Sequence, residues 1–177
     1  MEFEKLVNER YSVRNFKEVP VESDKIMKIL ETGRIAPTAS NKQPQRLLVL
    51  TKPEDLGKID QVTRCRFGSR LVIVVCSDIN ECWERSFDQE KSWQVDASII
   101  TDHMMLQAQD LGLGTLWVMH FDAQKTSSLF DLDENIIPVS LLVIGYAADD
   151  CGPSEKHSQR NVLSHTVLNY SELLKDL

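Results

Sequence analysis

Two arginines and a serine stand at alternate positions near the start of the sequence. Arg10, Ser12 and Arg14 are each separated by one residue. In an extended segment alternate residues share one side, so the three polar side chains would face the same way. A guanidinium matches the oxygens of a phosphate in a two-point contact, and a serine hydroxyl adds a donor. The segment is a candidate phosphate site; the alternative interpretation is a solvated charged turn beside Glu9.

A second candidate is a loop of small polar residues bracketed by prolines. Residues 36–44 have the sequence APTASNKQP. Such a loop can bring backbone groups and the Asn41 amide close to a flat ligand, or it can be a plain surface connection. Both interpretations stay open on composition alone.

A third stretch contains two glycines and ends at a histidine. Residues 112–115 have the sequence GLGT, which follows an expected helix and precedes an expected strand. A dinucleotide fingerprint has the opposite context, because it follows a strand and opens a helix, so a Rossmann site is excluded. His120 ends that strand and is the histidine we expect to touch a ligand. His103 is expected in a core or interface, and His157 and His165 on the surface.

Composition restricts the class of protein. The chain of 177 residues has a net charge of −7, which argues against general nucleic-acid binding, and its length suits one domain spanning residues 1–177. The four cysteines lack zinc spacing, so we expect free thiols and no metal. Since the apolar runs are too short for a bilayer and no secretory signal is seen, we expect a soluble cytoplasmic protein.

The elements that must position these residues follow from apolar periodicity and from turn residues. We expect helices over residues 3–10, 23–35, 53–61, 93–111 and 122–130. We expect strands over residues 46–51, 71–76, 115–120 and 139–147. Residues 79–92 are irregular and polar, and could form a lid or pack on the core. The pattern predicts a layered α+β or α/β domain.

The helix expected over residues 93–111 is apolar around more than half of its circumference. A short chain has limited means to cover such a helix alone, which favours an extensive dimer interface.

Taken in order, three of these stretches resemble the motifs of the nitroreductase family of flavoproteins. Residues 10–14 are similar to the R-x-S-x-R/K motif, and residues 36–44 to the A-P-S-x-x-N-x-Q-P loop. Residues 112–122 are similar to the G-L-G-T-x-W-x-x-x-F-D segment. The resemblance runs from residue 3 to about residue 165.

The resemblance implies an α+β fold with a central, mostly antiparallel sheet flanked by helices. It also implies an intertwined homodimer, bound FMN at the interface and NAD(P)H as electron donor. The residues it assigns to the cofactor site are Arg10, Tyr11, Ser12, Arg14, Pro37, Thr38, Ala39, Asn41, Gln61, Arg64, Trp117, Val118, Met119, His120 and Arg160.

The family also implies roles for these positions. Arg10, Ser12 and Arg160 would hold the phosphate and ribityl end, and Arg14 would lie near the pyrimidine edge. Residues 37–41 would come from the second subunit, and Gln61 and Arg64 would face the isoalloxazine. A backbone N–H near Met119 would donate to flavin N5. No side chain need act as nucleophile, because the flavin carries the chemistry and the protein supplies orientation and electrostatics.

The sequence departs from the family pattern in three places. Gln45 stands where an aromatic residue is usual, and His120 stands where a small residue is usual. Residues 153–160 contain a single arginine, where two basic groups are common. His120 could narrow the pocket or contact the substrate.

Two functions remain open from the sequence. The first is an enzyme that transfers hydride from NAD(P)H through FMN to a small electrophile, such as a nitroaromatic or a quinone, by a ping-pong mechanism. The second is a flavin-binding protein without turnover, such as a flavin store, a redox sensor or a partner-bound module.

Overall fold

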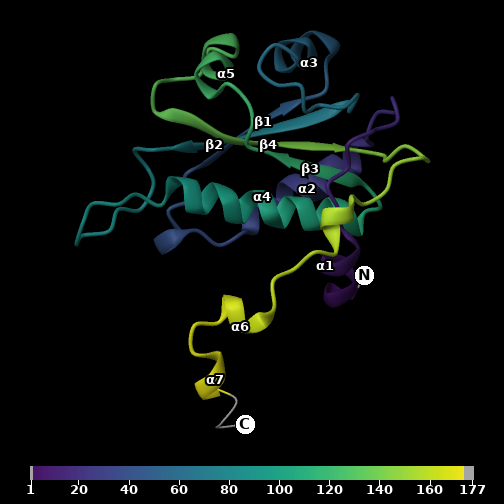
Figure 1. Cartoon of the computed structure of the whole chain (residues 1–177). Helices are drawn as coiled ribbons and strands as arrows, with labels where there is room; N and C mark the ends of the chain where they lie inside the picture. Colours follow the sequence, from purple (N-terminus) through teal and green to yellow (C-terminus); the bar gives the residue numbers. More distant parts are fainter. Residues whose placement is uncertain (1, 174–177) are drawn as a thin grey trace.

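The computed structural model describes residues 2–173, with a four-stranded sheet at its centre (Figure 1). The strands are β1 (Gln45–Leu50), β2 (Leu71–Asp78), β3 (Gly114–Val118) and β4 (Ile136–Gly145). They lie in the order β1-β2-β4-β3, and every neighbouring pair is antiparallel. The predicted α+β fold with a central antiparallel sheet is confirmed. β4 begins three residues before its predicted start, and Pro138 lies inside it at a register shift opposite Cys76.

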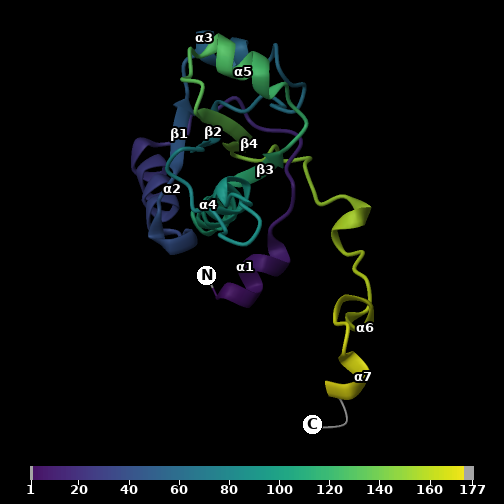
Figure 2. The ribbon, with the colours of Figure 1, turned by 90° about the vertical axis from the view of Figure 1, so that its left-hand side faces the viewer.

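Helices cover both faces of the sheet (Figures 1 and 2). One face packs against α4 (Trp93–Asp110), which in turn packs against α2 (Ser23–Ile35). The other face lies under α3 (Pro53–Ile59) and α5 (Ala123–Leu129). β2 is buried along its whole length because both of its faces are covered.

The helix ends follow the residues that the sequence offers. Pro53 stands in the first turn of α3. Backbone N–H groups in the first turn of a helix have no partner within the helix, so the missing N–H of proline costs no hydrogen bond there. Gly112, at φ +78°, ends α4 with bonds from the Gly112 N–H to the Gln109 carbonyl and from the Leu113 N–H to the Ala108 carbonyl. Asp122 caps α5, since its carboxylate accepts the Lys125 N–H at 2.9 Å.

The chain after α1 (Phe3–Glu9) runs along the free side of β3. Ser12 forms a parallel bridge with Thr115, and the Val13 N–H donates to the Thr115 carbonyl at 2.9 Å. A pair of opposed glycines, Gly114 and Gly145, makes room for this crossing. A Cβ on Gly114 would lie 2.5 Å from the nearest methyl carbon of Val13. The extended conformation of residues 10–14 is therefore fixed by close packing on the sheet.

Two segments stand off the body. Residues 79–92 form a hairpin arm, closed by a bridge between Glu84 and Lys91, which projects beyond the N-terminal end of α4 (Figure 1). After β4 the chain passes η2 (Glu155–His157) and leads away from the sheet through α6 (Leu163–Thr166) and α7 (Tyr170–Leu173) (Figure 2). No helix among residues 2–173 is both long and apolar enough to span a bilayer.

Candidate functional site

The alternating residues of the first motif meet the C-terminal segment in one pocket of about 240 Å³, named here the cationic pocket. Its lining residues are Arg10, Tyr11, Ser12, Arg14, Ser154, Lys156, His157 and Arg160. The structure thus brings together the sequence-predicted residues Arg10, Ser12, Arg14 and Arg160, although they come from opposite ends of the chain.

The arginines of the cationic pocket form no ion pair with an acid in the part of the chain that the structure describes. No Asp or Glu is among the described residues that line it. Arg14 donates to the Ser12 carbonyl at 3.3 Å, and Arg160 donates to the carbonyls of Lys156 and Gln159. The Nε of Arg10 is buried and has no hydrogen-bond partner within residues 2–173. A buried donor without a partner is destabilising, so this set of donors fits an anion such as a phosphate group.

Tyr11 anchors the segment rather than offering its hydroxyl to the pocket. The hydroxyl donates to the Cys151 carbonyl at 3.0 Å, and burial is the main cause that raises the pKa of Tyr11. His157, expected to be exposed, is half-buried, because its Nε2 lies 3.1 Å from the Asn8 carbonyl oxygen at the end of α1. Sequence reasoning missed His157, Lys156 and Ser154, whose one available signal is their closeness to Arg160 in the chain.

Gln61, Arg64 and His120 meet in a second pocket of about 570 Å³, the His120 pocket, which lies between α3 and α5. Two bonds join the loops that carry them. The Thr63 hydroxyl donates to the His120 carbonyl at 2.7 Å, and the Asp122 N–H donates to the Val62 carbonyl at 3.0 Å. The fold therefore brings these three sequence-predicted residues together.

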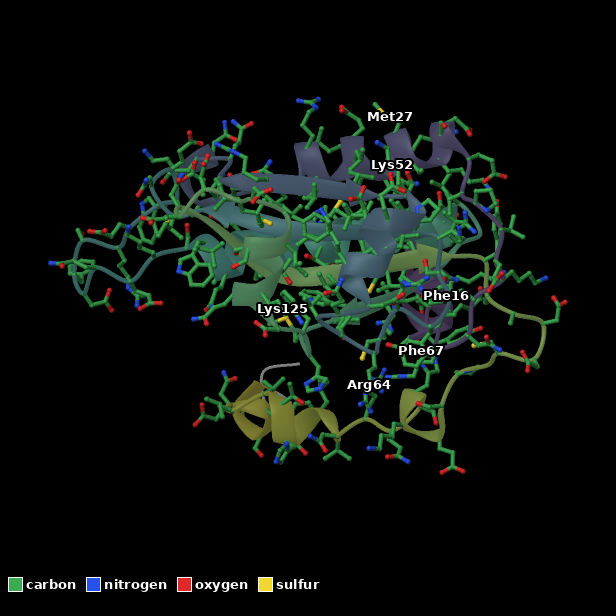
Figure 3. All side chains as sticks on the ribbon, turned by 90° about the horizontal axis from the view of Figure 1, so that it is seen from above. Phe16, Met27, Lys52, Arg64, Phe67 and Lys125 are labelled. Atoms are coloured by element: carbon green, nitrogen blue, oxygen red, sulfur yellow. The ribbon has the colours of Figure 1, made fainter. Side chains whose placement is uncertain are left out.

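The carboxylates of the His120 pocket already have partners. Asp60 forms a two-point ion pair with Arg66 at 2.7 and 2.6 Å, and this hydrogen bonding raises the pKa of Arg66. Asp122 is engaged in capping α5. Arg64 has no carboxylate partner among the described residues and extends from the edge of the body opposite Met27 (Figure 3). Arg64 is thus the charged side chain of this pocket that is not engaged with another residue's carboxylate or with a helix end in the described chain.

The residues at the end of β3 alternate as a strand requires. Trp117 packs on the α4 side of the sheet and Val118 is buried on the other side. Met119 is 64% exposed, and His120 is exposed at the pocket. Because the side chains of Trp117 and Val118 face the core, a ligand beside this strand would meet mainly backbone groups.

Residues 37–41 lie at the opposite end of α4 from the cationic pocket. The Ala39 N–H donates to the carboxylate of Asp96, in the first turn of α4, at 2.8 Å. The arginine segment instead contacts Thr115, just beyond the last turn of the same helix. A helix of 18 residues spans roughly 27 Å, so one copy of the chain does not bring Pro37, Thr38, Ala39 and Asn41 to the cationic pocket.

Comparison with known proteins identifies the family of this chain. The model of the Nitroreductase family matches residues 7–70 and 67–146 of this chain. The chain belongs to the nitroreductase family. It is accordingly an oxidoreductase, and its sheet and flanking helices are the nitroreductase fold.

Individual nitroreductase relatives resemble most of the chain. A protein of Archaeoglobus fulgidus, whose assigned name proposes an NADH dehydrogenase or NAD(P)H nitroreductase, is 29% identical over 155 residues, with 82% of this chain and 86% of the relative covered. A nitroreductase family structure from Clostridium difficile has a TM-score of 0.89 and 39% identity, covering 94% of this chain and 97% of that one. A structure from Exiguobacterium sibiricum, in complex with FMN, shares the fold with a TM-score of 0.83 at 21% identity, covering 94% and 96%.

Gln45, one of the departures from the nitroreductase pattern, begins β1 opposite Ser77. Its Oε1 and the Ser77 hydroxyl are both buried and have no hydrogen-bond partner among the described residues. Nothing in the structure explains why this member has Gln45 where an aromatic residue is usual.

Proposed function

We propose that this protein binds FMN, with its phosphate in the cationic pocket and its ring beside β3 and the His120 pocket. The observation that carries the proposal is the set of Arg10, Ser12, Arg14 and Arg160 around a space that no carboxylate lines within the described chain. The FMN complex of the Exiguobacterium relative, which has the same fold, supports the choice of this cofactor.

The proposed reaction takes hydride from NAD(P)H and delivers it to a small electrophile, a nitroaromatic or a quinone, in two half-reactions. FMN, when bound, supplies the hydride-accepting and hydride-donating chemistry. The protein supplies charge and orientation: Arg14 and Arg64 are the cations available to the ring edge, and Gln61 adds an amide. His120, exposed at the mouth of its pocket, is positioned to contact the acceptor.

The proposed working unit is a homodimer. Val95, Ile99, His103 and Leu106 follow one another at helical spacing on α4, and each remains partly or fully exposed. The side chain of Val95 is 61% exposed. The same helix face borders a groove shared with Phe3 and Leu6 of α1. A second copy on this face would cover the apolar stripe and would bring its residues 37–41 to the flavin site. The free cysteines suit a reducing cytoplasm.

An absorption spectrum of the freshly purified protein tests the cofactor. Flavin bands, with FMN released on denaturation, are expected. A colourless protein that also takes up no added FMN contradicts the proposal.

Rapid mixing with NADH or NADPH then separates the enzyme from a flavin-binding protein without turnover. Bleaching by one nicotinamide, followed by recovery on addition of a quinone, is the expected result. A fully loaded protein that neither nicotinamide reduces would instead be a store or a sensor.

A further inference from the structure

His157, which lines the cationic pocket, is fixed by a hydrogen bond to the end of α1. Its Nε2 lies 3.1 Å from the carbonyl oxygen of Asn8, in the last turn of that helix, where carbonyl groups are free to accept from a side chain. A carbonyl oxygen accepts and never donates, so this contact assigns the hydrogen of the bond to Nε2. The neutral imidazole therefore has its lone pair on Nδ1.

Nδ1 is the ring nitrogen that is left for a ligand. It has no hydrogen-bond partner within residues 2–173. The ring is held at the pocket because His157 ends η2, where its N–H donates to the Ser154 carbonyl at 2.8 Å. An Nδ1 with a lone pair repels a phosphate oxygen, whereas a protonated Nδ1 donates to it.

The charged side chains that face His157 in the pocket are, within the described chain, all cationic: Arg10, Arg14, Lys156 and Arg160. Tyr11, the other titratable group there, donates its hydroxyl to the Cys151 carbonyl. The acids of α1 and η2 are exposed and do not line the pocket; they are Glu4, Glu9 and Glu155. The negative charge that stabilises an imidazolium must therefore arrive with the ligand. A phosphate monoester carries nearly two negative charges at about pH 7.

We propose that His157 binds the FMN phosphate as an imidazolium, with Nε2 on the Asn8 carbonyl and Nδ1 donating to the phosphate. Neutral His157, one proton from solvent and the FMN dianion give the imidazolium and the bound dianion, and no covalent bond of FMN changes. Histidine suits this role because its charge changes between about pH 5 and 8. The inference rests on the proposed function and extends it, because it couples cofactor binding to proton uptake.

Isothermal titration calorimetry counts this proton. FMN is titrated at about pH 7.5, where its phosphate is already ionised, into the full chain stripped of flavin. The slope of the observed heat against the ionisation enthalpy of the buffer, in Tris and in HEPES, gives the proton uptake. We expect roughly half to one proton for wild type. FMN binding by wild type without proton uptake overturns the proposal.

Two variants assign the proton to a residue. His157→Gln keeps an amide N–H for the Asn8 carbonyl but has no group that gains a proton, so its uptake should vanish. His165→Gln, which replaces an exposed histidine of α6 outside the pocket, is the matched control and keeps the wild-type uptake. Wild-type uptake in His157→Gln overturns the assignment.

Riboflavin is the matched ligand, because it has the same ring and ribityl chain without the phosphate. Its binding should take up no proton. An uptake equal to that of FMN would place the titrating group beside the ring, where His120 lies, and would contradict the role of His157.

Flavin fluorescence after dilution of the holoprotein gives an independent measurement. Between about pH 7.5 and 8.5 the Kd for FMN should rise severalfold, up to about tenfold, in wild type and should not change in His157→Gln. The difference in affinity between the two proteins should therefore shrink as the pH rises. A histidine with a merely structural role would give a difference that does not depend on pH.

The outcomes separate this inference from the function on which it rests. A wild-type chain that binds no FMN contradicts the proposed function. FMN that binds in the cationic pocket, as shown by loss of affinity in Arg10→Ala, but binds without proton uptake contradicts the inference alone.

Discussion

Arg10, Arg14 and Arg160 have no acidic partner among residues 2–173, and this sets them apart from the paired arginines elsewhere on the surface. Arg34, for example, is held by Glu31 at 2.6 and 2.7 Å on α2. A paired guanidinium is already satisfied, whereas an unpaired one in a pocket gains most from an incoming anion. Substitution of an unpaired arginine in the pocket should therefore change the affinity for FMN, whereas substitution of a paired surface arginine should not.

Replacing Arg10 with alanine should weaken FMN binding by about 1.5–3 kcal/mol, the range for a hydrogen bond to a charged group. Titration of the apoprotein followed by flavin fluorescence measures the change. Arg34→Ala should leave the affinity unchanged. Equal affinities for wild type and Arg10→Ala would remove Arg10 from the site.

Asp78 at the end of β2 should make stability depend on pH. Its carboxylate accepts the Asn135 amide at 2.9 Å and the Asn80 N–H at 3.0 Å, and the bond from Asn135 is the largest cause that lowers its pKa below 3.8. A lowered folded-state pKa stabilises the fold above the unfolded-state pKa, and this stabilisation is lost as the pH falls through the folded-state pKa.

Asp78→Asn should therefore lower the free energy of unfolding at neutral pH by about 1–3 kcal/mol. The gap to wild type should narrow below about pH 4, where the Asp78 carboxylate takes up its proton in the unfolded chain, and should close as the pH falls through the lowered folded-state pKa. Urea unfolding at the two pH values measures both effects, and Asp133→Asn at an exposed position serves as the control. If the difference in unfolding free energy between wild type and Asp78→Asn grows in acid, the assigned direction of the Asp78 pKa shift is wrong.

At the element scale, the crossing of residues 10–17 over β3 depends on the opposed glycines. Gly114→Ala would force its Cβ against the buried, β-branched Val13, which has little freedom to turn aside. We expect a loss of about 1–3 kcal/mol in stability from overpacking.

The same substitution should also weaken FMN binding, because the displaced segment carries Arg10 and Ser12. Thermal unfolding and flavin titration measure the two effects. The double variant Gly114→Ala with Val13→Ala should recover part of the stability and part of the FMN affinity. If the second substitution lowers them further, the contact between the new Cβ and Val13 is not the cause of the loss.

Elements with a strong local signal were predictable from sequence. The run of apolar, β-branched residues predicts strand β2, and the broad apolar face predicts the long helix α4. Gly112 marks the end of α4, and Pro53 and Asp122 mark the starts of α3 and α5. The bridge that closes the hairpin arm was not predictable, since Glu84 and Lys91 carry no turn signature. Nor was the meeting of His157 with Asn8, because a contact between the two ends of a chain leaves no local pattern.

The candidate site was predictable only in part for the same reason. Arg10, Ser12 and Arg14 show their common direction by spacing, and the resemblance extended the set to Gln61, Arg64 and Arg160. The role of Asp96 could not be predicted from the sequence. Its carboxylate accepts hydrogen bonds from the Ser92 hydroxyl and the Ala39 N–H, and the fold is needed to bring these two donors to it.

At the scale of the whole molecule, the exposed stripe on α4 carries the proposed assembly. Val95→Lys should leave the isolated chain folded, because this side chain is 61% exposed, but should place a charge in the apolar interface. We expect light scattering to report a monomer and the flavin to be lost with the dimer. Gln94→Lys, which adds the same charge at the neighbouring exposed position of α4, serves as the control. A Val95→Lys protein that remains a flavin-loaded dimer would place the interface elsewhere.

The segment that carries Arg10 and Ser12 also has a protective role. By pairing with Thr115 it covers the outer edge of β3, whose backbone groups would otherwise be open to another strand. A chain shortened before residue 15 would lose its phosphate-binding arginines and gain a bare, apolar strand edge at the same time. Such a fragment should therefore self-associate edge to edge and precipitate, and solubility in the cell would report on the integrity of the cofactor site.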